Sequence, residues 1–249
     1  MICPPQPPSA DPEPPDNDHA TETTTTYAQW KQWSSDDFGV CSRREASYFA
    51  WHLARCHPTP VRDVLELGFG NGKFMGFAAS RGLNAVGIET DTTLLRRARA
   101  GGYVAHASIA DVPDVQLFDA IVAFDVLEHI PQDALIPLFQ AFASKLRADG
   151  AVLCRVPNGE SPFGRLYQHG DLTHCSTLGM SKFRQIAVAC GFEVVAYGQE
   201  PWYVESRHPM RMVRRSAQWF IGLCVAVAYP FDRRALTPNL VVAMKKRYT

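Results

Sequence analysis

The stretch Val64–Gly72, VLELGFGNG, decides the fold, because an apolar run ends in an acid followed by three alternating glycines. This pattern predicts a buried strand that ends in a glycine turn and opens a helix. Glycine permits the tight turn and lets a ligand lie against bare backbone. Glu89 follows Gly68 by twenty-one residues and ends a second apolar run, Ala85–Ile88. An acid at that spacing suits the two hydroxyls of a ribose, so the sequence predicts a site for an adenosine-containing cofactor.

The charge beside the turn distinguishes two kinds of adenosine cofactor. Glu66 lies two residues before the first glycine, where the pyrophosphate of a dinucleotide would meet the helix N-terminus. A carboxylate there repels a pyrophosphate, whereas it attracts the ammonium and sulfonium of S-adenosylmethionine. The glycine spacing also departs from G-x-G-x-x-G, because Gly72 comes one position early. Both features favour S-adenosylmethionine over a nicotinamide dinucleotide.

With this acid and these glycines, the sequence resembles the class I S-adenosylmethionine-dependent methyltransferases. The similarity covers about residues 46–199 and includes the block Phe118–Ile130, FDAIVAFDVLEHI, with its Leu-Glu-His run, and the later pair Gly191-Phe192. The resemblance implies S-adenosylmethionine as the cofactor. It also implies a set of cofactor-binding residues: Glu66, Gly68, Gly70, Gly72, Glu89, Ser108, Ile109 and Asp125.

One position departs from the family's pattern. The third strand of the family leads to a Gly-Asp pair whose acid contacts the adenine amino group, whereas this chain has Ser108 at the aligned place. Two alternatives stay open for the adenine contact. The Ser108 hydroxyl replaces the acid, or Asp111 reaches around to the adenine.

Apolar runs alternate with helical spacings along most of the chain. We expect strands at 63–67, 85–88, 103–105, 120–124, 151–156, 193–197 and 240–244, and helices at 72–81, 92–100, 132–147 and 181–190, with a turn at Asp149-Gly150. Repeated strand–helix units predict an α/β fold with a doubly wound, mostly parallel, seven-stranded Rossmann-like sheet and helices on both faces. Ligands in such sheets bind beyond the carboxyl ends of the strands, where Glu66, Glu89 and Asp125 fall.

Composition divides the chain into five parts. We expect a disordered Pro/Thr-rich tail at 1–26, an N-terminal helical cap at 27–58, the S-adenosylmethionine-binding core at 59–200, a basic and apolar insertion at 201–237, and the last strand of the core at 238–249. The insertion contains Ala217–Tyr229, whose thirteen residues are too few to span a bilayer. It is interpreted either as a helix packed on the core or as a peripheral membrane contact through residues 207–234.

Charge and cysteine usage restrict the partners and the compartment. The 25 basic and 25 acidic side chains give no overall attraction to nucleic acid, so no nucleic-acid partner is expected. The seven cysteines form no C-x-x-C pair, which predicts reduced thiols and a cytoplasmic location. A membrane contact through the insertion would make the cytoplasmic protein membrane-associated.

The acceptor side of the site is predicted from two segments that follow strands. Methyl transfer needs donor and acceptor held in line, and a hydroxyl acceptor also needs a general base. His129 follows the strand at 120–124, and the long polar loop 157–177 contains His169, Asp171 and His174. We expect His174 to be a base oriented by Asp171, and His129 to be a second base or a pocket wall. Turn-capping and packing roles are the alternatives for all three.

A metal site made of His169, Asp171 and His174 has suitable ligand types, but the ligands are crowded into one loop, so no metal is predicted. The sequence therefore predicts an enzyme that methylates oxygen, or nitrogen, of a small-molecule acceptor, with lipid-linked and saccharide acceptors as narrower classes. The alternatives are a cofactor-binding module without chemistry and a nicotinamide-dependent oxidoreductase.

Overall fold

The computed structural model describes residues 31, 33, 37–56, 60–198, 209–228 and 237–247. The chain separates into two compact units, Met1–Ser35 and Asp36–Thr249, and the fold described here is that of the second unit. The tail predicted to be disordered, residues 1–26, lies outside the described residues. The five predicted domain boundaries therefore stay predictions.

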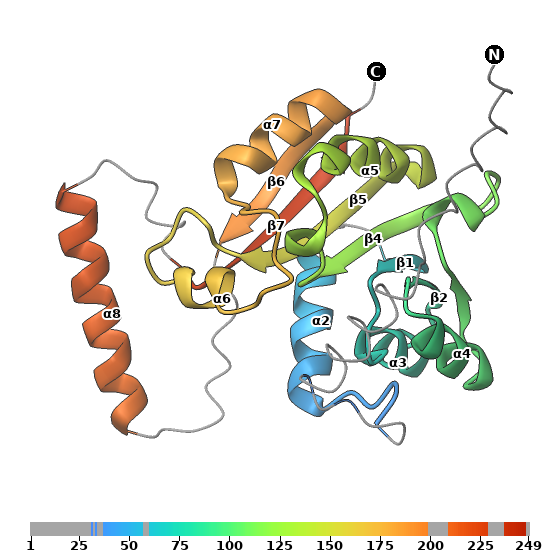
Figure 1. The fold of residues 1–249 in the computed structure, drawn as a ribbon, viewed down its shortest axis with the longest axis horizontal. Helices are drawn as coiled ribbons and strands as arrows, with labels where there is room; N and C mark the ends of the chain where they lie inside the picture. The colour runs from blue at the N-terminus through green and yellow to red at the C-terminus, as the bar shows by residue number, and fades with distance from the viewer. Residues whose placement is uncertain are drawn as a thin grey trace, which may run out of the picture. The chain divides into compact units, whose positions relative to one another are not determined.

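A seven-stranded sheet forms the centre of the second unit, in the order β3-β2-β1-β4-β5-β7-β6 (Figure 1). The strands are β1 (Asp63–Leu67), β2 (Asn84–Ile88), β3 (Val104–His106), β4 (Phe118–Phe124), β5 (Leu146–Pro157), β6 (Phe192–Gly198) and β7 (Asn239–Lys246). Strand β7 runs antiparallel to β5 and β6, and the other neighbouring pairs are parallel. The strand order reverses between β1 and β4, which is where ligands bind in sheets of this kind.

Helices cover both faces of this sheet. The helices of the described residues are α2 (Arg43–Cys56), α3 (Lys73–Ser80), α4 (Thr92–Ala100), α5 (Gln132–Lys145), α6 (Arg165–His169), α7 (Met180–Cys190) and α8 (Pro209–Ala228), with short 3₁₀ turns η1 (Ile109–Asp111) and η2 (Leu127–His129). By its described residues, helix α8 is not among those that cover the sheet. Helix α7 ends at Gly191, whose φ of 72° is the left-handed conformation that commonly ends a helix. In the described part of the chain, no helix has both the length and the apolar composition that a membrane crossing needs.

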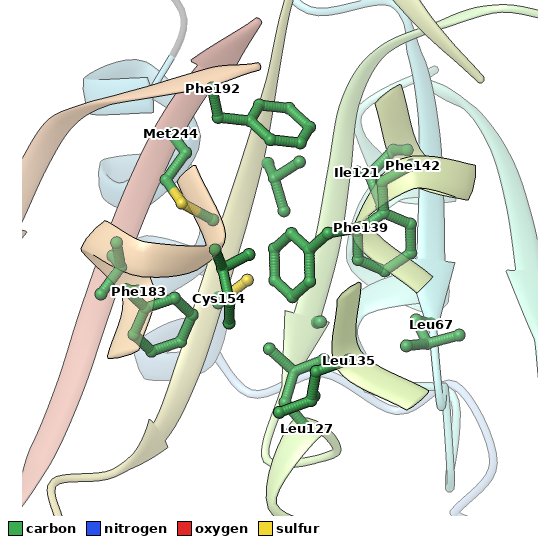
Figure 2. Close-up of a cluster of buried hydrophobic side chains, with 14 of the residues drawn as sticks. Leu67, Ile121, Leu127, Leu135, Phe139, Phe142, Cys154, Phe183, Phe192 and Met244 are labelled. Atoms are coloured by element: carbon green, nitrogen blue, oxygen red, sulfur yellow. The ribbon is translucent and has the colours of Figure 1, made fainter. Parts of the chain in front are cut away.

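Two apolar clusters pack against opposite faces of the sheet. Successive residues of a strand point to opposite faces, so Leu65 and Ile121 belong to one cluster while Val64 and Val122 belong to the other. Helices α5 and α7 pack into the first cluster through three fully buried phenylalanines, Phe139, Phe142 and Phe183 (Figure 2). Helices α2 and α3 pack into the second cluster through Phe49, Leu53, Phe74 and Phe77. The predicted layering, with helices on both faces, is confirmed.

The boundary between α5 and β5 differs from the prediction. The helix was expected to continue to residue 147 and the turn to lie at Asp149-Gly150, but α5 ends at Lys145 and β5 already begins at Leu146. Leu146 is buried and pairs with Phe118, whereas Ala120 pairs with Ala151, so the predicted turn is an irregularity within β5. Burial of Leu146 beside β4 therefore overrides the local helical pattern.

Candidate functional site

The glycine turn after β1 adopts a backbone conformation that other residues rarely take. Gly68, Gly70 and Gly72 have φ values of 65°, 50° and 71°, all in the left-handed region. A Cβ atom added to Gly68 would lie 2.5 Å from Cγ2 of Val126, which follows β4. The turn is therefore packed closely against the segment that follows β4, and these two segments form one edge of the site.

The chain before α2 contacts the outer side of this turn. The Gly39 amide donates to the Asn71 carbonyl at 2.9 Å, and the Asn71 side-chain amide donates to the Asp37 carbonyl at 3.2 Å. The Phe38 ring meets the edge of Phe69 at a centroid distance of 6.1 Å. Residues 37–39 therefore pack directly against the glycine turn.

Glu66 is a buried acid beside the turn. Its side chain is 5% exposed, and among the described residues its Oε2 atom has no hydrogen-bond partner. Burial and the neighbouring Glu89 raise the pKa of Glu66 well above its ordinary value, although a hydrogen bond from the Met75 amide opposes the rise. A cation placed beside Glu66 would favour the ionised carboxylate, because it would offset the cost of burying that charge. The unpaired Oε2 atom therefore fits the positively charged end of S-adenosylmethionine.

Glu89 is oriented by three backbone amides. Its Oε2 atom accepts from Gly70 at 3.0 Å, and its Oε1 atom accepts from Thr90 at 2.8 Å and Asp91 at 3.2 Å. A carboxylate offers about four acceptor positions, so at least one remains for a ribose hydroxyl. The carboxylate thus links the glycine turn to the end of β2, and its predicted role at the ribose stays a prediction.

Replacing Glu89 with alanine is expected to weaken binding of S-adenosylhomocysteine by ~1–3 kcal/mol, because a charged hydrogen bond to the ribose is lost. Isothermal titration measures this change. Glu193→Ala serves as the control, because Glu193 is an exposed acid on β6. Equal affinities for Glu89→Ala and wild type would remove Glu89 from the site.

The segment after β3 forms a capping box instead of leaving its polar groups free. The Ser108 hydroxyl accepts from the Ala110 amide at 3.2 Å, and the Asp111 carboxylate accepts from the Ser108 amide at 3.0 Å. Ser108 and Asp111, the two alternatives for the adenine contact, are therefore part of one local structure that begins η1. Ile109 packs partly against the core. The cofactor roles of Ser108 and Ile109 stay predictions.

Asp125 follows β4 with a φ of 54°, an unusual conformation for a residue other than glycine. Its carboxylate forms a two-point ion pair with Arg155 of β5, in which Arg155 Nε donates to Oδ1 at 2.8 Å and Nη2 donates to Oδ2. The guanidinium also lies over the Tyr48 ring, 5.3 Å from its centroid. Sequence reasoning missed Arg155, although a lone arginine in an apolar strand next to Pro157 was a usable signal. The predicted cofactor role of Asp125 stays a prediction.

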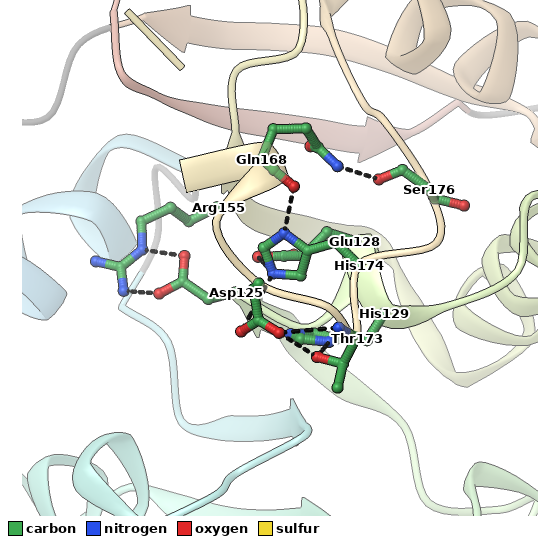
Figure 3. Close-up of polar contacts among 9 residues, drawn as sticks. Asp125, Glu128, His129, Arg155, Gln168, Thr173, His174 and Ser176 are labelled. Atoms are coloured by element: carbon green, nitrogen blue, oxygen red, sulfur yellow. Dashed lines mark hydrogen bonds and ion pairs between the residues drawn. The ribbon is translucent and has the colours of Figure 1, made fainter. Parts of the chain in front are cut away.

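The two predicted histidines meet beside η2 (Figure 3). The rings of His129 and His174 lie 4.6 Å apart by their centroids, with planes inclined by 76°. His174 Nδ1 is 3.0 Å from the Gln168 carbonyl oxygen, which only accepts, so Nδ1 carries the proton. The Nε2 atom of neutral His174 therefore carries the lone pair. It lies 4.0 Å from Glu128 Oε1 and 3.8 Å from Asp171 Oδ2.

Asp171 orients His129 through Thr173. Burial works to raise the pKa of Asp171, but hydrogen bonds from Thr173 hold it below its ordinary value, so the group is an anion at neutral pH. The Thr173 hydroxyl donates to Asp171 Oδ1 at 2.6 Å, which leaves its oxygen to accept from His129 Nδ1 at 2.9 Å. Neutral His129 therefore also carries its lone pair on Nε2. The group that hydrogen-bonds to His174 is the Gln168 carbonyl. Asp171 lies near His174 without a hydrogen bond to it, at 3.8 Å between Nε2 and Oδ2.

Backbone hydrogen bonds hold the two histidine-bearing segments together. The amides of Cys175 and Ser176 both donate to the Glu128 carbonyl at 2.9 Å. The Ser176 hydroxyl donates to the Ile130 carbonyl at 2.6 Å, and the Gln168 side-chain amide donates to the Ser176 carbonyl at 3.2 Å. Sequence reasoning missed Thr173 and Gln168, because their roles depend on contacts between distant segments.

The same cluster has the ligand types of a metal site. One ligand atom from each of Glu128, His129 and His174 lies within 4.8 Å of the others. Two histidines and a carboxylate suit a first-row divalent metal. This set differs from the one considered in the sequence, since His169 is exposed and lies outside the group.

Comparison with known proteins extends these observations. The family model described as "Methyltransferase domain" matches residues 28–197. Comparison with curated proteins gives no sequence match. The fold is similar to a SAM dependent methyltransferase from Archaeoglobus fulgidus, with 15% identity and a TM-score of 0.60 over 90% of this chain and 99% of that chain. The fold is also similar to an S-adenosylmethionine dependent methyltransferase from Mesorhizobium loti, with 15% identity and a TM-score of 0.54 over 82% of this chain and 98% of that chain.

A further similar structure is the plantazolicin methyltransferase BamL, bound to a triazolic analogue and SAH, with 14% identity and a TM-score of 0.56 over 92% of this chain and 91% of that chain. Identities this low establish the fold, whereas the family match covers more than half of the chain. The family uses S-adenosylmethionine as its cofactor, and the acid and glycines after β1 fit that molecule. The chain belongs to the methyltransferase-domain family and has the fold of the class I S-adenosylmethionine-dependent methyltransferases.

Proposed function

We propose that this enzyme transfers the methyl group of S-adenosylmethionine to an oxygen, or a nitrogen, of a small-molecule acceptor. The observation that carries the proposal is the meeting of His129 and His174 after β4 and β5, each with its Nδ1 proton held by a hydrogen bond. His174 therefore has its Nε2 lone pair, and not its Nδ1, to act as a base. His129 lies on the segment after β4 that also packs against the glycine turn through Val126, and His174 lies on the loop after β5.

The proposed chemistry uses the protein mainly to position groups and to accept a proton. When bound, S-adenosylmethionine supplies a methyl group that is already activated by the positive charge on sulfur. His174 Nε2 accepts the proton of an acceptor hydroxyl. Carboxylate oxygens of Glu128 and Asp171 lie within 4.0 Å of that nitrogen. Asp171 and Thr173 keep His129 in one tautomer beside it.

A small acceptor is supported by the balanced charge, since the chain shows no excess of basic residues for a nucleic acid. BamL, a structural neighbour, holds a triazolic analogue together with SAH. Lipid-linked and saccharide acceptors are the narrower classes that we propose to test first. A cytoplasmic site of action is proposed from the cysteines, and the six in the described residues are free thiols.

The proposal is tested by incubating the protein with a fractionated cell extract and S-adenosylmethionine that carries a deuterated methyl group. We expect mass spectrometry to find the label in small molecules. Label found only in the protein or nucleic-acid fraction would contradict the proposal. A chelator is expected to leave turnover unchanged, whereas loss of turnover that a divalent metal restores would assign the Glu128–His129–His174 cluster to a metal instead of a base.

A further inference from the structure

Helix α8 carries an apolar stripe that is exposed. The stripe consists of residues spaced four and three apart, all of them exposed: Val213, Ala217, Phe220, Cys224 and Val227. This spacing places them on one side of the helix. Val213, Phe220 and Val227 are 62%, 60% and 79% exposed, so the stripe is a continuous apolar surface. Continuous apolar surfaces of this kind mark interaction sites, whereas single exposed apolar residues do not.

The opposite side of α8 is basic by its register. Arg211, Arg214 and Arg215 are followed by Gln218, a spacing that puts these four positions on one side of the helix. The helix contains no acidic residue. Residues 207–234 hold six arginines and one aspartate, in a chain whose formal net charge is +0. Positive charge is therefore concentrated in and around α8.

We propose that α8 lies in the plane of an anionic lipid surface. The apolar stripe enters the boundary between headgroups and acyl chains, and the arginine positions stay with the headgroups. Trp219, which is 70% exposed one helical turn after Arg215, lies between the stripe and the arginine positions and has the amphipathic ring that favours this boundary. The attachment goes beyond methyl transfer and does not depend on it.

The chemistry of α8 favours a lipid surface over the other occupants of an apolar stripe. Each arginine is attracted to an anionic surface. An apolar stripe combined with charge of a single sign suits an anionic bilayer, which has an apolar interior and negatively charged headgroups. A protein partner would need an apolar groove shaped to the stripe. The proposal places α8 along the surface, with its apolar stripe in the interface and its axis in the membrane plane.

Vesicle sedimentation of the full-length protein tests this inference. The vesicles contain phosphatidylcholine alone or a mixture with anionic phosphatidylglycerol, each at low and high salt. We expect binding to the anionic vesicles to be roughly tenfold stronger than to the neutral ones and to weaken at high salt. Equal binding to both vesicle types, or no binding to either at low salt, would overturn the proposal.

Two sets of variants separate the apolar and the charged contributions. Trp219→Ser combined with Phe220→Ser is expected to weaken binding by about tenfold or more, because two aromatic side chains no longer enter the interface. Val188→Ser is the matched control, since Val188 is 76% exposed on α7. Unchanged binding of the Trp219/Phe220 double variant would contradict the proposal.

The charge variants replace Arg211, Arg214 and Arg215 with glutamine, and Arg43→Gln with Arg44→Gln is the control on exposed positions of α2. The first set is expected to lose most of the salt dependence, and the control is expected to keep it. Unchanged affinity for S-adenosylhomocysteine verifies that each variant is folded. If light scattering instead finds a dimer that the Trp219/Phe220 variant converts to a monomer, a second copy covers the stripe and the inference is wrong.

Discussion

Gly70→Val abolishes the binding of S-adenosylhomocysteine in this account, with an affinity at least about a hundredfold below that of wild type, or ~2.7 kcal/mol. Gly70 has a φ of 50°, and its amide donates to Glu89 Oε2 at 3.0 Å. A β-branched residue is strained in that conformation, and its side chain fills space that the ligand needs next to the backbone. Isothermal titration of purified, folded protein measures the loss.

Gly82→Val is the matched control for this variant. Gly82 has a φ of 67°, and a Cβ atom added there meets nothing within 4 Å in the described part of the chain. The control therefore has similar backbone strain away from the glycine turn. Normal affinity for Gly82→Val together with loss in Gly70→Val supports the site. Wild-type affinity in Gly70→Val means that the turn does not bind the cofactor, and equal losses in both variants mean that strain alone is the cause.

His174→Ala is expected to reduce kcat by about 10²- to 10⁴-fold with a hydroxyl acceptor, because the proton acceptor is removed. The affinity for S-adenosylhomocysteine is expected to stay unchanged, since none of the predicted cofactor residues lies in the loop 157–177 that carries His174. Steady-state kinetics and titration are measured on the same preparation. Thr173→Val is expected to lower kcat less than His174→Ala does. It removes only the hydrogen bond to His129 Nδ1 that keeps His129 in one tautomer.

His169→Ala is the control, because His169 is an exposed histidine five positions earlier in the chain. It is expected to retain wild-type kcat and cofactor affinity. A His174→Ala variant as active as His169→Ala would remove the base from the mechanism. Equal losses of turnover and cofactor affinity in His174→Ala would indicate that His174 has a structural role instead.

The cofactor half of the fold could be predicted because its signals are local. The VLELGFGNG stretch predicts β1 and the turn, and the predicted helix 92–100 matches α4, whose Asp91 side chain accepts from the amides of Thr93 and Leu94. Apolar runs of this kind become central strands wherever they are buried on both faces. The place of β7 between β5 and β6 was not predicted, because it depends on antiparallel pairing of β7 with β5 over a long sequence separation.

The acceptor half was predicted by residue type but not by partner. His129 and His174 were chosen for their chemistry and do meet, yet the group that orients His174 is the Gln168 backbone carbonyl. A backbone carbonyl has no sequence signature. Likewise, the partner of Asp125 is Arg155, which register between β4 and β5 brings close. Such pairs become visible only when the strands are aligned.

The central claim is that the acid and glycines after β1 hold a positively charged methyl donor. Isothermal titration of the wild-type protein with S-adenosylhomocysteine and, in parallel, with NAD tests it most directly. This account predicts saturable binding of S-adenosylhomocysteine and no measurable heat of binding with NAD. Binding of NAD without binding of S-adenosylhomocysteine would contradict it.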